Sequence, residues 1–255
     1  MTDRQPPGLP LKSNLRPGEE AAFDFMVGRV RGADQANIGL IRGEPYASDY
    51  FRALANAPIL GEALARMGQA VMEVSACKDT LSDADHEFCD VVIAFDSGYH
   101  WLMAGHASLA VRAGVRIEAI KAVREGRETD LTDDEHQLVE FTRAVRDGMM
   151  TAEIWDNMIK RLGSERGAIE YSYFILVILF NHLLAKAIGI PDIPEPELDL
   201  LLSNLEDEGS KVSYRDYVKI FGDAAFTTKK DKLFKDEVAP GVSPRQQQNP
   251  FQESD

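Results

Sequence analysis

The sequence predicts an all-α protein, and three kinds of observation support this fold class. Apolar residues recur at intervals of three and four along most of the chain, which is the spacing of one helix face. Ser or Thr stands directly before several of these segments, where it can cap the start of a helix, and Gly often follows them. No segment reads convincingly as a β-strand.

The composition limits the classes of partner and the compartment. The chain has 255 residues, of which 44% are hydrophobic, so a full core can form. The formal net charge of −14 argues against nucleic acid and anionic membranes as partners. Two cysteines, Cys77 and Cys89, exclude a disulfide framework. The N-terminus lacks the apolar core of a signal peptide and no run reaches transmembrane length, so we expect a cytoplasmic protein.

The chain divides into three parts by composition. Residues 1–17 are rich in proline and read as an extended arm. Residues 18–195 carry the helical patterns and read as one domain. Residues 196–255 become polar and charged after a short helical stretch, and we expect an extension that is partly disordered or wrapped on a neighbouring subunit.

Helices are predicted on both sides of a central hairpin. Before it they span Gly18–Val30, Pro45–Asn56 and Pro58–Val74, the third with an apolar face made of Leu60, Leu64, Met67 and Val71. After it come Arg116–Glu125, a helix capped by Thr132 with Glu135 in a capping box, a helix capped by Thr151, and Glu165–Ile188. The last of these is the longest and most apolar, and we expect it to be buried.

The central hairpin spans Leu81–Gly114. Ser82 is a good N-cap for its first helix, and the Ser97-Gly98 pair predicts the end of that helix. We expect the second helix to begin near Tyr99 and to end before Gly114.

Three ionisable residues inside this apolar hairpin are the candidate functional groups: Glu87 on the first helix, and His100 and His106 on the second. A carboxylate and an imidazole on packed helices can exchange a proton near neutral pH, because burial and pairing shift their pKa values. The simpler interpretation is a Glu–His hydrogen bond that only joins two helices.

The run from His106 to Val115, with Ala110 and Gly114 at intervals of four, resembles the signature of the carboxymuconolactone decarboxylase and alkyl hydroperoxidase D-like family. The short segment Asn56–Leu60 is similar to the opening helix of that family, and Glu87 stands where the family carries a glutamate. The similarity extends from about Phe51 to Ile190. It implies a helical bundle of the alkyl hydroperoxidase D type.

Two departures set the chain apart from the branches of this family. Where the peroxidase branch has Cys-x-x-Cys, this sequence has Tyr99 and Leu102, so the redox pair is absent. Where the decarboxylase branch has Tyr-x-Trp, it has Trp101 and Met103. The resemblance therefore implies a divergent member with a substrate of its own.

The resemblance also implies a site and an activity. Glu87 and His106 would be the catalytic pair, and Tyr99, His100, Trp101 and Met103 would bind the substrate. The expected enzyme is a carbon–carbon lyase or isomerase that uses no cofactor and acts on a small carbonyl, lactone or aromatic metabolite. Members of the family form trimers and hexamers, so we expect a homo-oligomer.

Three alternatives remain open at this stage. One is a thiol-dependent peroxidase that uses Cys89 or Cys77, although neither has a resolving cysteine beside it. Another is a non-catalytic helical oligomer. A metal site made from Glu87, His100 and His106 ranks below both, because their spacing matches no common metal motif, and we expect no metal.

Overall fold

The computed structural model describes residues 6–36, 40–41, 44–75 and 82–208, and it confirms the all-α class. The helices are α1 Glu20–Ala36, α2 Tyr46–Leu54, α3 Pro58–Ser75, α4 Asp83–Asp96, α5 Met103–Ala113, α6 Ile117–Glu125, α7 Asp133–Asp147, α8 Ala152–Leu162, α9 Glu165–Ile188 and α10 Glu195–Glu208. Two single-turn helices, η1 and η2, cover Lys12–Asn14 and Glu128–Asp130. A two-residue antiparallel ladder joins β1 (Leu40–Ile41) to β2 (Glu44–Pro45), which the sequence did not predict.

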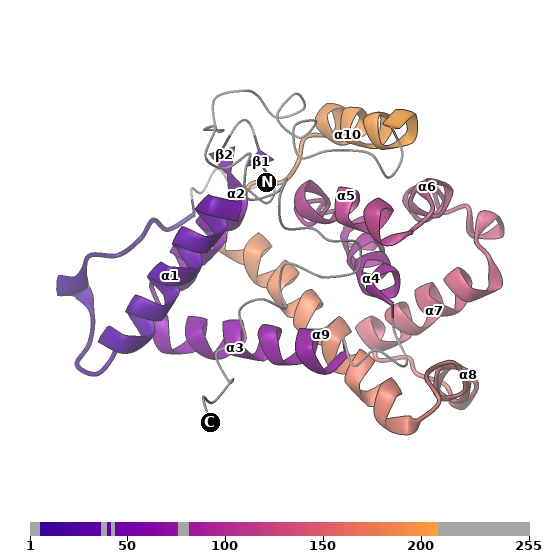
Figure 1. Ribbon diagram of the computed structural model, residues 1–255, viewed down its shortest axis with the longest axis horizontal. Coiled ribbons are helices and arrows are strands. Elements are labelled where there is room, and N and C mark those ends of the chain that lie inside the picture. Colours follow the sequence, from indigo (N-terminus) through magenta and orange to yellow (C-terminus); the bar gives the residue numbers. More distant parts are fainter. Residues whose placement is uncertain (1–5, 37–39, 42–43, 76–81, 209–255) are drawn as a thin grey trace, which may run out of the picture.

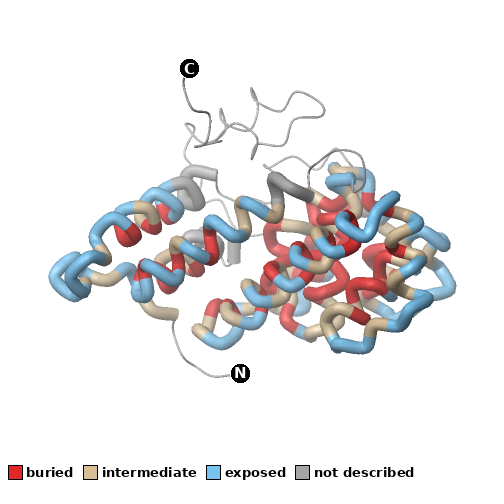
Figure 2. The backbone as a smooth tube through the Cα atoms, turned by 90° about the horizontal axis from the view of Figure 1, so that it is seen from below, coloured by how far each residue is buried: buried red, intermediate tan, exposed pale blue. Residues whose placement is uncertain are grey.

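Helix α4 lies at the centre of the larger helical group. It packs against α5, α6, α7 and α9, and α10 covers α5 and α6 from the other side (Figure 1). Helices α1, α2 and α3 form the opposite end of the molecule, which α3 joins to the rest through its contact with α9. Figure 2 shows that the buried residues concentrate in the half that contains α4. The central hairpin predicted from the sequence is therefore at the core of the protein.

Side chains hold both ends of α4 in place. Ser82 Oγ accepts a hydrogen bond from the backbone N–H of Asp85, and the Asp85 carboxylate accepts one from the N–H of Ser82, so the predicted N-cap is completed into a capping box. Arg161 on α8 also reaches Asp85, at 3.1 Å. At the other end, Arg143 on α7 binds both oxygens of Asp96, at 2.7 and 3.0 Å.

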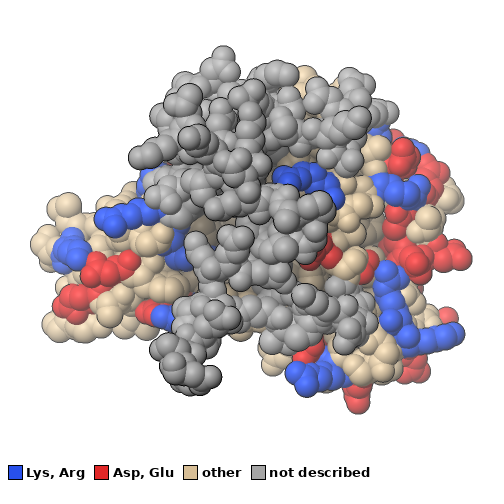
Figure 3. Space-filling model, viewed as in Figure 1, with Lys and Arg blue, Asp and Glu red and all other residues tan. Residues whose placement is uncertain are grey.

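Other helix boundaries follow the local sequence closely. Thr132 and Glu135 form the predicted capping box of α7, and Thr151 accepts a hydrogen bond at the start of α8 as predicted. Helix α9 has the predicted bounds. On the face shown in Figure 3, acidic and basic side chains lie beside one another toward both ends of the molecule. Several acidic and basic residues form ion pairs, such as Arg116 with Glu135.

The prediction that α9 is buried is wrong for one side of the helix. The other side, including Tyr171, Phe174 and Ile175, is buried against the core, but five apolar side chains are between 45% and 58% exposed. By length and composition α9 could cross a membrane, although 39% of its most apolar window is buried within the protein.

The prediction that the second hairpin helix begins near Tyr99 is wrong, because α5 begins at Met103. Contacts with a distant segment hold the four residues before it in a turn. The Tyr99 hydroxyl donates to the carbonyl of Ile190 at 2.8 Å, and the His100 N–H donates to the Asp192 carboxylate at 2.6 Å. A hydrogen bond between a backbone N–H and a residue far away in the sequence cannot be predicted from the local spacing of apolar residues.

The predicted apolar face of α3 is also partly wrong. Leu64 is buried as predicted, but Leu60 is 73% exposed and Met67 is 42% exposed. Helix α3 instead approaches α2 through Gly61, where an added Cβ would lie 2.9 Å from the carbonyl oxygen of Leu54. This close approach turns the helix so that Leu60 faces outward.

Candidate functional site

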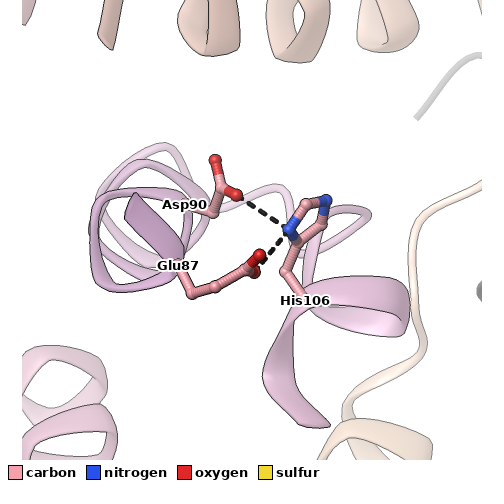
Figure 4. A group of neighbouring side chains, drawn as sticks. All are labelled: Glu87, Asp90 and His106. Carbon is pink, nitrogen blue, oxygen red and sulfur yellow. Dashed lines mark hydrogen bonds and ion pairs between the residues drawn. The ribbon is translucent and has the colours of Figure 1, made fainter. Parts of the chain in front are cut away.

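Two carboxylates of α4 and one imidazole of α5 meet at a single atom. His106 Nδ1 lies 2.8 Å from Glu87 Oε2 and 2.7 Å from Asp90 Oδ2. Figure 4 shows the two acidic side chains reaching from neighbouring turns of α4 toward the same ring nitrogen. We call Glu87, Asp90 and His106 the acid–histidine centre.

The sequence places these three side chains together by simple helix geometry. Glu87 and Asp90 are three residues apart, so they lie on one face of α4. Helix α5 can approach that face because Ala104 and Ala107, both fully buried, leave room between the two backbones. His106 lies between these two alanines and is directed at the two acids.

The centre is largely shielded from solvent. The Asp90 side chain is 3% exposed, and those of Glu87 and His106 are 14% and 15% exposed. Burial alone would lower the pKa of His106, but Asp90 and Glu87 outweigh it and raise that pKa from 6.5 to about 10. His106 is therefore an imidazolium at neutral pH, held between two carboxylates.

The ring has a second nitrogen that is not used by this contact. Nε2 of His106 points away from both carboxylates (Figure 4). Since an imidazolium carries a proton on each nitrogen, Nε2–H is a charged hydrogen-bond donor. The carboxylates keep the ring in one orientation, which is how a proton donor is prepared for a reaction.

The contacts of Tyr99 and His100 run toward the end of α9 and toward α10. Beyond its bond to Ile190, Tyr99 stacks on Trp101, with ring centroids 6.4 Å apart. His100 Nδ1 lies 3.5 Å from a carboxylate oxygen of Glu195 on α10. Their predicted role in substrate binding stays a prediction.

Trp101 and Met103 are both interior residues. Trp101 is 5% exposed and its ring lies 5.3 Å from that of Tyr50 on α2. Met103 is fully buried at the first turn of α5. Trp101 lies two residues before α5 and Met103 is its first residue, and their predicted role in substrate binding stays a prediction.

Asp90 is the member of the centre that sequence reasoning missed. It stands in an otherwise apolar run of α4, from Phe88 to Ala94. A single acid in such a run, three residues after Glu87, was the signal that could have identified it, because a buried carboxylate needs a partner.

Cys89 differs from a reactive thiol in its surroundings. Cys89 is fully buried, and burial raises its pKa well above the usual value, so the thiol stays protonated. Cys77 lies outside the described residues.

A scan against protein-family models found no family that matches the chain. Searches of curated proteins and of solved structures likewise found no match. The resemblance to the carboxymuconolactone decarboxylase family therefore remains a prediction from the residues quoted above, and the function has to be argued from the site.

Proposed function

We propose that the protein is a carboxymuconolactone decarboxylase-like enzyme, a carbon–carbon lyase or isomerase that acts on a small carbonyl, lactone or aromatic metabolite without a cofactor. The observation that carries this proposal is the imidazole of His106, whose Nδ1 contacts two carboxylates while Nε2 points away from them. The same pair of packed helices supports an alkyl hydroperoxidase D-like bundle as the fold.

The proposed reaction needs an acceptor for the electron pair of the carbon–carbon bond that breaks. When a β-keto acid loses CO2, the bond to the carboxylate carbon breaks, and its electron pair moves through the α-carbon to the ketone oxygen. That oxygen becomes an enolate, and Nε2–H of His106 stabilises it by a charged hydrogen bond. A proton from water then adds to the α-carbon, which regenerates the ketone.

The raised pKa of His106 supports the role of acid and electrostatic donor for this residue. A histidine with a pKa of about 10 is already protonated at neutral pH, so it cannot serve there as a base. Glu87 and Asp90 keep it charged and hold its orientation. Decarboxylation suits this arrangement, since its first step requires a stabilised oxyanion and no proton removal.

The test is an assay of the purified full chain with a panel of β-keto acids, lactones and aromatic aldehydes, without added cofactor. We expect turnover by the wild type and a loss of about 100-fold or more in His106→Gln. Gln retains a neutral N–H donor but lacks the positive charge of the imidazolium. The variant therefore tests the contribution of the charge separately from that of the side-chain volume. Leu200→Gln, a change on the exposed face of α10, is the control variant.

The pH profile adds a second test. We expect kcat to stay level through neutral pH and to fall as His106 loses its proton near pH 10. In Asp90→Asn the fall should move to lower pH, because one of the two charges that stabilise the imidazolium is gone. Equal activity in wild type and His106→Gln would remove this residue from the mechanism.

A metal centre is the second candidate, and one observation favours it. Single ligand atoms of Glu87, Asp90 and His106 all lie within 4.8 Å of one another. A carboxylate–carboxylate–imidazole set fits Mn²⁺, Fe²⁺ or Zn²⁺. In that case a cation would replace the proton on Nδ1 and polarise the substrate carbonyl.

Chelation distinguishes the two candidates. The acid–base proposal predicts that wild-type turnover survives treatment with EDTA and that elemental analysis finds less than about one metal ion per ten chains. Activity that is lost with EDTA and returns with one divalent ion, but not in Asp90→Asn, would replace it with the metal centre.

A further inference from the structure

A hollow in the surface lies between η2, α7 and the start of α8. Its volume is about 270 Å³. Helices α7 and α8 lie at the end of the molecule opposite α1 (Figure 1). None of the residues that line the hollow belongs to the acid–histidine centre, so it is a separate feature of the molecule. We call it the α7 hollow.

One part of the α7 hollow is apolar. Val139 and Ala144 are 2% and 6% exposed, so they belong to the core and form the bottom of the hollow. Ile154 is half-buried and Met149 is 73% exposed, which places Met149 at the open side. Ligand sites usually combine apolar walls with a few polar groups and have volumes from ~300 Å³ upward, so this hollow suits only a small molecule.

The other part of the α7 hollow is charged. Glu140, Arg143 and Asp147 recur at intervals of three and four along α7, so they share one face of that helix. Glu128 of η2 adds a third carboxylate, and His136 Nε2 lies 3.8 Å from it. The lining therefore contains three carboxylates and one guanidinium.

The arginines at the α7 hollow are already bound to carboxylates. Arg143 contacts both oxygens of Asp96 at 2.7 and 3.0 Å, and its remaining terminal nitrogen contacts Glu128. Arg146, which is next to the hollow in sequence, binds Asp147 at 2.7 Å and also reaches Asp96. Their positive charges are thus neutralised within the protein, so an anion in the hollow would have no cation of its own to bind.

Glu140 differs from the other two carboxylates of the lining. It is exposed, and it forms no hydrogen bond or ion pair with any residue in the described part of the chain. The uncompensated charge at the hollow is therefore negative, and it lies beside an apolar surface.

We propose that the α7 hollow binds a small organic cation, in which an ammonium group is attached to a short apolar body. The ammonium would pair with Glu140, and the apolar body would cover Val139, Ala144 and Met149. Ion pairing and burial of apolar surface then act on the two ends of one ligand. This site goes beyond the proposed function, since it shares no residue with the acid–histidine centre.

A bare metal ion fits the α7 hollow less well than an organic cation. Among the described residues, the acid–histidine centre has a set of three ligand atoms close enough to hold an ion together, and the side chains of the hollow form no such set. A metal ion would also leave the apolar surface of the hollow unused.

The first experiment is isothermal titration calorimetry of the full chain with three probes that share a phenyl ring and a short alkyl chain. They are 2-phenylethylammonium, neutral 2-phenylethanol and anionic 3-phenylpropionate. We expect the ammonium to bind at one site with a Kd of about 1 mM or tighter. The alcohol and the carboxylate should bind at least about fivefold more weakly, because they lack the ion pair.

Two variants at exposed side chains separate the charged part of the site from the apolar part. Glu140→Gln should weaken binding of the ammonium by about fivefold and leave the alcohol unchanged. Met149→Gln should weaken the ammonium and the alcohol by a similar factor, because both bury the same apolar surface. Glu118→Gln removes an exposed charge on α6 outside the hollow and should leave all three affinities unchanged. Thermal melts by circular dichroism confirm that each variant is folded.

Several results would overturn the proposal. One is the absence of saturable binding of the ammonium at millimolar concentration, and another is equal affinity for the ammonium and the alcohol. Equal weakening in Glu140→Gln and Glu118→Gln would show only a general attraction of cations to an acidic chain. Tighter binding of the carboxylate than of the ammonium would assign the hollow to anions.

Discussion

His106 and His182 are two histidines in the same core whose pKa values move in opposite directions. His106 contacts two carboxylates, which outweigh burial and raise its pKa to about 10. His182 on α9 is fully buried beside the hydroxyl of Ser97, 2.5 Å from its Nε2. Burial, with Lys186 and His100 nearby, lowers the pKa of His182 to about 4.

The comparison shows that the neighbours, more than burial, decide what a core histidine can do. Each ring is held by a contact to a side chain on α4 or at its end. The partner of His182 is a neutral hydroxyl, so the neutral ring is favoured and the pair joins α9 to the end of α4. The partners of His106 are charged, so its ring is a cation and its outer nitrogen is a strong donor.

The largest predicted effect comes from making His106 resemble His182. In the double variant Glu87→Gln and Asp90→Asn, both charges are gone and burial acts alone. We expect the pKa of His106 to fall below 6.5, its usual value. Loss of the buried ionic contacts should also lower the free energy of unfolding at pH 7 by about 3 kcal/mol.

NMR titration of the ring protons and chemical denaturation measure the two effects. Glu62→Gln with Glu118→Gln, a double change of the same type outside the centre, is the control. A pKa that stays near 10 in the double variant would show that other groups charge His106.

The next effect is a loss of stability in alkali that depends on His106. The folded state binds this proton more tightly than the unfolded state, so its contribution is complete below pH 6.5 and is lost as pH rises toward 10. Over this window the free energy of unfolding of the wild type should fall by on the order of 1 kcal/mol per pH unit relative to His106→Gln. Parallel curves for the two proteins would contradict the raised pKa.

His182 should give a smaller effect of the opposite sign, in acid. Here the unfolded state binds the proton more tightly, so stability is complete above pH 6.5 and is lost as pH falls toward 4. The pH range between the two pKa values of His182 is narrower than that of His106, so the total loss in the free energy of unfolding is smaller. Denaturation of the wild type and His182→Gln between pH 4 and 7 measures it. If His182→Gln loses as much stability in acid as the wild type, the loss is caused by titratable groups other than His182.

Local sequence signals predicted the helix starts and part of the site. Ser82, Thr132 and Thr151 were recognisable as caps because capping depends on residues within one turn. The Glu87–His106 contact was expected from two ionisable groups in an apolar hairpin, and the structure contains it.

What the sequence did not predict depends on contacts between distant segments. The turn before α5 depends on Asp192 and Ile190, which lie more than 80 residues further along the chain. Helix α9 is apolar on all sides, so no periodicity in its residues indicates which side faces outward. Asp90 went unrecognised because its role depends on where α5 packs.

The measurement that tests the central claim most directly is the protonation state of His106. Nitrogen-15 NMR of the full chain at pH 8 distinguishes an imidazolium from a neutral ring, and His106→Gln identifies the signal. We predict that both ring nitrogens of His106 are protonated at this pH, while His182 is neutral. A neutral His106 at pH 8 would contradict the account, because the ring would then lack the charge on which the proposed chemistry depends.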